Sequence, residues 1–275
     1  MHTPRVVSLA PSATATLDAM DAADLLVGVT HHCDPGASTG AAHGAGAPHD
    51  ASPVAVGGWL DPNLDRVADL DPDLVCTSDG LQAEVADACR ERGLRVSHAE
   101  PATLADVLER FRELGAAVGR EAAGEALTRD ARDRLDAVAD AVAHVTMGSV
   151  TSDHVTDDVD RPVVYCEEWS DPPMAAGNWV PDAVGAAGGR YPFVEPGERS
   201  RKVDARAVEA ADPDHVVLHV CGHGDRVDPA VVHDRGWAID APVHVLDDSL
   251  LNQPSPALID GIERLAAWLH PDAFS

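Results

Sequence analysis

The chain has 275 residues, of which 45% are hydrophobic, so it is long enough to bury one large core or the cores of two lobes. Its 47 acidic and 20 basic residues give a formal net charge of −27, which argues against nucleic acid and anionic membranes as partners because both would be repelled. The acidic residues are spread along the whole chain. We therefore interpret the charge as a halophilic surface kept hydrated by carboxylates, rather than as an acidic recognition site.

Residues 1–100 are predicted to form an N-terminal α/β lobe. Short apolar strands alternate there with helices, which is the pattern of a parallel sheet. Ser12 precedes the first helical stretch and is expected to be its N-cap. The expected strands are Val6–Leu9, Leu26–Val29, Val54–Val56, Leu74–Thr77 and Leu94–Val96. The expected helices are Ala13–Met20, Asn63–Leu70 and Ala83–Arg92.

Residues 101–146 carry no strand signal and are predicted to be linker helices, divided at Gly119. Apolar residues between Glu121 and Val145 recur at steps of three and four, which places them on one helical face. A continuous helix over that stretch would be roughly 37 Å long, which is too long for a crossover inside a small lobe. We interpret it as a rigid connection between two lobes.

The two predicted lobes share a repeated sequence. LDRVADLDPDLV over Leu64–Val75 is matched by ARAVEAADPDHV over Ala205–Val216, and in both an amphipathic helix leads through Asp-Pro-Asp into an apolar strand. The second copy lies in a C-terminal α/β lobe predicted for residues 162–275, which follows an acidic surface loop predicted for residues 147–161. Two similar lobes imply a cleft, and a cleft is a preferred place for a small ligand.

Tryptophans carry particular weight because only 4% of the residues are aromatic. Trp59, Trp169 and Trp179 follow predicted strands or lie in the loops after them, where an open α/β sheet presents its ligand site. Flat indoles suit a flat macrocycle, since they give a large apolar contact at little cost in entropy. The alternative is that one or two of them fill gaps in the core, as we expect for Trp237 and Trp268.

Two histidine clusters follow predicted strands, His31-His32-Cys33 and Cys221-Gly222-His223. Neutral imidazole is a good ligand for cobalt, iron or zinc, but neither cluster has the paired spacing of a structural zinc site. We expect these histidines to line a cleft and predict no metal site and no intrinsic cofactor. The alternative is that His32 or His223 serves as an axial ligand to a metal centre carried by the bound molecule.

The sequence offers no positive case for catalysis. Ser12, Cys33 and Ser78 are the candidate nucleophiles, yet no G-x-S-x-G elbow occurs. Glu167 and Glu168 are adjacent on a predicted strand, so their side chains point to opposite faces and cannot form a catalytic dyad. We therefore predict that the protein is not an enzyme.

Four segments together resemble a known family over nearly the whole chain: VVSLAPSATATLDAM, VGGWLDPNLDRVADLDPDLV, EEWSDPPMAAGNWVPDAVGAAGG and DDSLLNQPSPALIDGIERL. They are similar to the class III substrate-binding proteins of ABC importers, which take up cobalamin and ferric siderophores, and most of all to the cobalamin-binding branch. The resemblance implies an α/β fold of two Rossmann-like lobes with parallel sheets, joined by one long rigid helix. The ligand is then held in the cleft between the lobes.

The resemblance makes a corrinoid, cobalamin, the expected ligand. A ferric siderophore or haem is the first alternative, which arginines facing the cleft would favour because such ligands are anionic. An enzyme of corrinoid or metal metabolism on the same fold is the second. The residues expected to contact the ligand are Pro11, Ser12, His31, His32, Trp59, Ser78, Asp79, Trp169, Trp179, His223 and Asp248.

Transport members of the family place one acidic residue on each lobe to dock arginines of the membrane permease. Asp65 matches the first of these positions, whereas the repeat puts Arg206, with reversed charge, at the second. We therefore expect docking to an ABC permease to be weakened, and we expect a monomer. The five cysteines include no CxxC pair and suit a reduced compartment, with Cys76, Cys166 and Cys221 as small buried hydrophobes.

The location expected from the sequence as written is the cytoplasm. The first predicted strand begins close to Met1, and no apolar leader segment or lipid-attachment cysteine is visible. If the start is truncated, the expected location becomes the cell surface.

Overall fold

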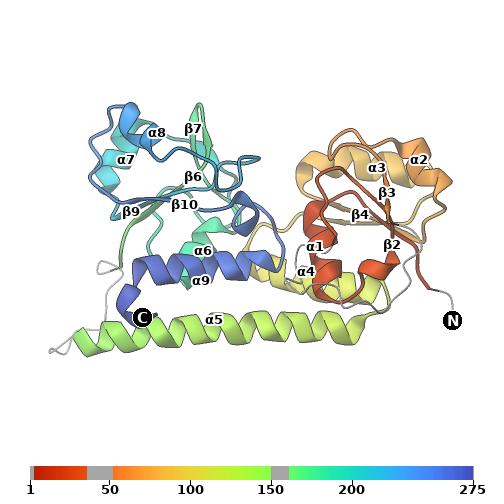
Figure 1. Ribbon diagram of the computed structural model, residues 1–275, viewed down its shortest axis with the longest axis horizontal. Coiled ribbons are helices and arrows are strands. Elements are labelled where there is room, and N and C mark those ends of the chain that lie inside the picture. The colour runs from red at the N-terminus through yellow and green to blue at the C-terminus, as the bar shows by residue number, and fades with distance from the viewer. Residues whose placement is uncertain (1–2, 36–51, 150–160, 275) are drawn as a thin grey trace. The chain divides into compact units, whose positions relative to one another are not determined.

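The computed structural model describes residues 3–35, 52–149 and 161–274, and its chain forms two compact units. Unit 1 comprises Met1–Pro101 with Asp106–Asp130, and unit 2 comprises Ala102–Ala105 with Ala131–Ser275. Each unit contains one five-stranded sheet with helices on both faces (Figure 1). The predicted α/β fold class with two lobes is therefore confirmed.

The sheet of unit 1 is entirely parallel. Its strands, in spatial order, are β3 (Val54–Ala55), β2 (Leu26–Val29), β1 (Val6–Ser8), β4 (Leu74–Ser78) and β5 (Val96–Ala99). Its helices are α1 (Pro11–Ala19), α2 (Leu64–Asp69), α3 (Ala83–Glu91) and most of α4 (Leu104–Ala117), with short 3₁₀ turns η1 (Ala23–Leu25) and η2 (Gly80–Gln82).

Strand alternation decides which helix covers which face of this sheet. Val6 of β1 packs into a core with Leu17 of α1 and Leu114 of α4. Its neighbour Val7 faces the opposite side and packs into a second core, which includes Val67 of α2. Figure 1 shows the result, with α2 and α3 over one face of the sheet and α1 and α4 against the other.

The sheet of unit 2 is mixed, so the expectation of wholly parallel strands is wrong for this unit. β7 pairs antiparallel with β6 and β8 because it follows β6 after only Asp171-Pro172, which is too short for the crossover that a parallel pair requires. The strands, in spatial order, are β10 (Val243–Val245), β9 (His215–Leu218), β6 (Val164–Ser170), β7 (Pro173–Ala175) and β8 (Arg201–Lys202).

Helices cover both faces of the unit 2 sheet as well. Tyr165 of β6 packs with Val208 of α7 and Val232 of α8, whereas Val164 faces the side where Val184 of α6 and Leu269 of α9 lie. The helices are α6 (Val180–Ala186), α7 (Ala205–Ala211), α8 (Ala230–Asp234) and α9 (Ala257–Leu269), with 3₁₀ turns η4 (Asp248–Leu250) and η5 (Pro271–Ala273).

The predicted long helix is present as α5 (Glu121–Ser149), and the division between the two units falls inside it. Gly119, with a φ of +71°, separates α5 from α4 as expected. On the unit 2 side, Arg134 pairs with Glu263 of α9 at 2.6 Å and with Asp260 at 2.5 Å. The acidic loop predicted for residues 147–161 lies outside the described residues over 150–160 and overlaps the end of α5 before them.

The sequence repeat corresponds to a repeated local structure, which begins with the caps of α2 and α7. The Asn63 side chain accepts a hydrogen bond from Arg66 N at 3.0 Å, and that of Asp204 accepts one from Ala207 N at 2.9 Å. Both bonds satisfy a backbone N–H that the first turn of a helix leaves unpaired. The helix boundary predicted at Asn63 is set by this cap.

The Asp-Pro-Asp motifs then attach each helix to the start of its sheet. The first aspartates, Asp71 and Asp212, adopt left-handed backbone with φ of +44° and +46°. The carboxylates of the second aspartates accept backbone N–H groups just before the first strand of each unit, Asp73 from Arg5 N at 2.8 Å and Asp214 from Val163 N at 2.7 Å. The motif is thus a structural joint and not a ligand site.

The cysteines differ in their surroundings. Cys76, Cys89 and Cys166 are buried, and burial raises the pKa of the Cys76 thiol to about 11. Cys221 is exposed, so the expectation that it is a buried hydrophobe is wrong, because β9 ends before it and the chain turns there. No helix in the described part of the chain combines the length and apolar composition needed to cross a membrane.

Candidate functional site: the carboxyl edges of the two sheets

The carboxyl ends of the strands are where open α/β sheets present ligand sites. We call the loops after β1, β2, β3, β4 and β5 the unit 1 edge, and the loops after β6, β9 and β10 the unit 2 edge. The unit 1 edge carries the predicted residues Pro11, Ser12, His31, His32, Trp59, Ser78 and Asp79. The unit 2 edge carries Trp169, His223 and Asp248.

Three loops of the unit 1 edge are joined by one buried side chain, Gln82. Its Nε2 donates to the carbonyl of Leu9 at 2.9 Å and to the carbonyl of Trp59 at 2.7 Å, while its Oε1 accepts from Ser78 N at 2.8 Å. Gln82 is 0% exposed. Sequence reasoning missed it because its partners lie in loops that are distant along the chain.

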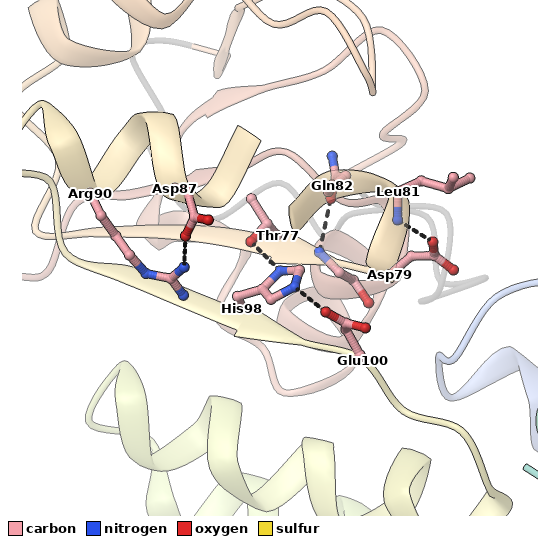
Figure 2. Close-up of polar contacts among 9 residues, drawn as sticks. Thr77, Asp79, Leu81, Gln82, Asp87, Arg90, His98 and Glu100 are labelled. Atoms are coloured by element: carbon pink, nitrogen blue, oxygen red, sulfur yellow. Dashed lines mark hydrogen bonds and ion pairs between the residues drawn. The ribbon is translucent and has the colours of Figure 1, made fainter. Parts of the chain in front are cut away.

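Beside Gln82, the η2 turn exposes an apolar side chain. Asp79 has a φ of +76°, which is unusual for a residue other than glycine, and its carboxylate accepts from Leu81 N at 2.8 Å (Figure 2). Leu81 is 59% exposed, and Leu60, next to Trp59, is 50% exposed. Exposed large apolar side chains at a sheet edge are typical of a contact surface for an apolar ligand.

A short polar chain lies on the neighbouring strands β4 and β5. His98 bonds Thr77 Oγ1 through Nδ1 at 2.9 Å and Glu100 Oε1 through Nε2 at 3.1 Å (Figure 2). The side chain of Glu100 is half exposed, so the chain ends in solvent at the edge. None of these three residues was predicted to belong to the site.

The residues predicted after β1 and β2 are placed at the edge, with one correction. Ala10, not Ser12, is the N-cap of α1, because Pro11 fits the first helical position and leaves Ser12 inside the helix, 7% exposed. His31 and His32 are exposed in the turn after β2. In the described residues no three histidine, cysteine or acidic side chains gather as a metal site.

The three tryptophans take different positions. Trp59 is partly exposed on the unit 1 edge, and Trp169, at the end of β6, is 46% exposed, with its indole N–H donating to the carbonyl of Asp171. Trp179 is 5% exposed and donates to the carbonyl of Leu251 at 2.8 Å. Its indole is therefore largely covered by unit 2, and its contact with a ligand stays a prediction.

An ion pair lies buried under the unit 2 edge. Glu167, 0% exposed, forms a two-pronged bond with Arg235 at 2.6 and 2.7 Å and also accepts from Tyr165 and from Ser170 at the end of β6. Burial, with the Glu167 charge adding to it, raises the pKa of Tyr165. The hydrogen bond to Glu167 raises the pKa of Arg235. The ion pair thus fixes the end of the strand that carries Trp169.

Hydrogen bonds also hold the loop after β9. The Asp248 carboxylate accepts from Gly222 N and Gly224 N, both at 2.8 Å, so this predicted ligand residue shapes the turn that presents His223. His219 is buried, its Nδ1 contacts Asn252 Oδ1, and burial lowers its pKa to about 4. A neutral His219 therefore forms part of the support of this loop.

Cationic side chains are distributed unevenly between the two edges. The loops of the unit 1 edge, read over residues 9–12, 30–35, 52–63, 78–82 and 100–103, contain no lysine or arginine. On the unit 2 edge, Arg226 is exposed and bonds the carbonyl of His223, while Arg235 is committed to Glu167. Arg201 and Lys202 of β8 are also exposed, and Lys202 pairs with Met174 of β7, which in turn pairs with Trp169. Cations are therefore absent from the described unit 1 loops but present on the unit 2 sheet near Trp169.

Comparison with known proteins decides the family. The model of the periplasmic binding protein family matches residues 6–241. The chain belongs to the periplasmic binding protein family. The family consists of non-enzymatic ligand-binding proteins, so the prediction that this chain is not an enzyme is confirmed. The resemblance to class III substrate-binding proteins is confirmed as well.

Several relatives are similar along nearly the whole chain. A cobalamin-binding protein of Halobacterium salinarum is 28% identical over 97% of this chain and 69% of its own length. The substrate-binding lipoprotein YvrC of an uncharacterised ABC transporter of Bacillus subtilis is 26% identical over 98% of this chain and 81% of its own. The structure of the periplasmic heme-binding protein HutB of Vibrio cholerae is 15% identical, with a TM-score of 0.74 over 98% of this chain and 100% of that one.

Proposed function

We propose that this protein binds a corrinoid, cobalamin, as the substrate-binding component of an ABC importer. The names of similar proteins support this choice, since one is a cobalamin-binding protein and another a substrate-binding lipoprotein of an ABC transporter. They also include a heme-binding protein of the same fold, so the ligand has to be argued from the residues of this chain.

The observation that carries the proposal is an apolar, cation-poor edge. Trp59, Leu60 and Leu81 are exposed or partly exposed on the unit 1 edge, and Trp169 is exposed on the unit 2 edge, so each edge offers an apolar surface of the kind that suits a flat macrocycle. Haem carries two carboxylates and ferric siderophores are commonly anionic, so both favour cations, which the loops of the unit 1 edge do not supply. The amide side chains of cobalamin are neutral and need only hydrogen bonds, which the loop backbones provide.

The test is calorimetry with cyanocobalamin, haemin and an anionic ferric siderophore, each on the same preparation. We expect a stoichiometry near one with cyanocobalamin and weaker or no binding of the two anionic ligands. Clear binding of haemin or the siderophore together with no heat from any cobalamin would show that the corrinoid assignment is wrong.

The tryptophans provide the matching variants. Trp59→Ala and Trp169→Ala are each expected to weaken cyanocobalamin binding by about 1–3 kcal/mol without loss of the fold, as anchor aromatics do. Trp268→Phe is the control, because Trp268 lies in α9 and stacks on His244 at 4.4 Å. If both edge variants lose stability while the fraction that remains folded binds with unchanged affinity, the two indoles are core residues and not ligand contacts.

The importer part of the proposal needs a permease as partner. Asp65 is suited to docking, since its side chain is 91% exposed on α2, with Arg92 at 3.7 Å. At the equivalent place in the repeat, α7 carries the exposed Arg206, so we propose that docking is weaker than with two acids. Co-purification with the permease, compared between the wild type and Asp65→Arg, measures the contribution of Asp65.

A further inference from the structure

Gln82 makes three hydrogen bonds with one primary amide. Its primary amide supplies two donors and one acceptor, and all three meet backbone groups of the unit 1 edge, the carbonyls of Leu9 and Trp59 and the N–H of Ser78. From its turn after β4, Gln82 thus reaches the loops after β1 and β3 and the last residue of β4. Figure 2 shows Gln82 beside the turn that carries Asp79 and Leu81.

The hydrogen bond from Gln82 to the carbonyl of Trp59 influences how the Trp59 indole is presented at the edge. The loop after β3 is bonded to its surroundings at Gly57, whose carbonyl accepts from His31 N at 3.0 Å, and at Trp59, whose carbonyl accepts from Gln82. Between β3 and α2 the loop contains Gly57 and Gly58, which restrict its backbone little. The base of the loop is closed by the bond from Asn63 N to the carbonyl of Val56 at 2.7 Å and by the bridge between Gly57 and Pro62. The Gln82 contact is the bond made to the backbone of Trp59 itself, at the tip of the loop.

We propose that Gln82 is a positioning residue for ligand binding, which holds the Trp59 loop and the η2 turn in register so that Trp59 and Leu81 present one apolar surface. The proposal rests on the proposed function, because it assigns the surface to the same ligand. Gln82 itself is buried and does not contact the ligand. Its effect reaches the ligand through the backbone of Trp59.

The decisive variant is Gln82→Glu, which has nearly the same shape. Near pH 8 its carboxylate accepts from Ser78 N but faces the carbonyls of Leu9 and Trp59 without a proton to donate. At low pH the protonated acid again donates to one of them. We therefore expect cyanocobalamin affinity to fall about tenfold or more near pH 8 and to recover partly near pH 5, since one such bond is worth about a factor of ten.

Three comparisons control this experiment. Glu91→Gln exchanges the same two functional groups on the exposed end of α3, away from both edges, and it is expected to leave the pH profile as in the wild type. Gln82→Met removes every hydrogen bond at similar volume, so its affinity is expected to be low at both pH values. Circular dichroism of each variant identifies any variant that fails to fold. Gln82→Asn, which keeps an amide, is then measured in place of the variant that does not fold.

A measurement without ligand separates this proposal from the proposed function. The indole N–H signal of Trp59 in a ¹⁵N spectrum, assigned with Trp59→Phe, is expected to shift in Gln82→Glu near pH 8 and to return toward the wild-type position near pH 5. If the wild type binds no cyanocobalamin, the proposed function fails while this signal still tests the positioning. Wild-type affinity and an unmoved Trp59 signal in Gln82→Glu at both pH values would overturn the proposal.

Discussion

The two sheet edges hold their loops with opposite chemistry. Under the unit 1 edge a neutral amide, Gln82, bonds three backbone groups, whereas under the unit 2 edge a charged pair, Glu167 with Arg235, ties a strand end to a distant loop. Burying an amide with all its bonds made costs little, but burying two charges carries a large desolvation cost that their attraction only offsets. The unit 1 edge is thus held by neutral hydrogen bonds. The unit 2 edge is held by an ion pair whose attraction is opposed by a large desolvation cost.

The contrast is informative because the scaffolds beneath the edges are alike. α2 with β4 and α7 with β9 share the same caps and the same Asp-Pro-Asp joint. The difference begins only where the strands end. The repeated scaffold therefore carries loops that differ between the two units. The Trp59 backbone is held by Gln82, whereas the end of the strand that carries Trp169 is held by the ion pair of Glu167 with Arg235.

The largest effect is expected from Arg235→Met. Removing the guanidinium leaves Glu167 buried without its cation, so we expect the free energy of unfolding to fall by about 3–5 kcal/mol in chemical denaturation at pH 7. Arg226→Met, at an exposed arginine of the same edge, is the control and is expected to change stability by less than about 0.5 kcal/mol. Equal losses of stability in the two variants would show that the buried ion pair does not contribute more than an exposed arginine.

A smaller loss is expected from Gln82→Met. The variant leaves two carbonyls and one N–H without their partner but buries no charge, so we expect about 1–3 kcal/mol of destabilisation by the same measurement. A loss as large as that of Arg235→Met would mean that the neutral edge is held as strongly as the charged one, and the contrast drawn above would fail.

The smallest effect is expected from pH, and it belongs to unit 2. Burial lowers the pKa of His219 from 6.5 to about 4, so below about pH 6.5 the unfolded chain takes up a proton that the folded chain does not. The stability that His219 contributes is present above pH 6.5 and is lost as the pH falls toward 4. Between pH 7 and pH 5 we expect the wild type to lose about 1–2 kcal/mol more than His219→Asn.

Denaturation of both proteins at the two pH values measures this difference. The comparison of two proteins cancels the titration of the other groups, which His219→Asn leaves in place. A difference near zero would indicate that water or Asn252 allows the His219 imidazole to be protonated in the folded protein.

Local signals in the sequence predicted much of the fold. The start of a helix at Asn63, the break at Gly119 and the strand that begins at Val6 each depend on residues close in sequence, so a pattern can reveal them. β5 begins at Val96 and not at Leu94, because pairing with β4 sets its register. β7 and β8 were not predicted, since strands this short depend on their partners across the sheet.

The candidate site was predicted less well for the same physical reason. Trp59 and Trp169 were singled out because rare aromatics after strands are a visible signal, and both lie partly exposed at a sheet edge, while their contact with a ligand stays a prediction. Trp179 looked similar in the sequence, yet its indole is fixed inside unit 2 by a bond to Leu251, 72 residues away. Gln82 gave no signal at all, because its role comes from a carbonyl 73 residues before it and another 23 before it.

The turn after β9 also offers a site, Cys221, at which the protein can be labelled as an optical reporter. Cys221 is exposed there, whereas Cys76, Cys89 and Cys166 are buried, so with Cys33 replaced by serine a thiol-reactive dye has one accessible target among the described residues. Burial of its sulfur, with Asp248 and Glu168 adding to it, raises the pKa of the Cys221 thiol, so the coupling runs faster in mildly alkaline buffer than at neutral pH. A dye at this position would sit beside His223, and its brightness would follow occupancy of the unit 2 edge in real time.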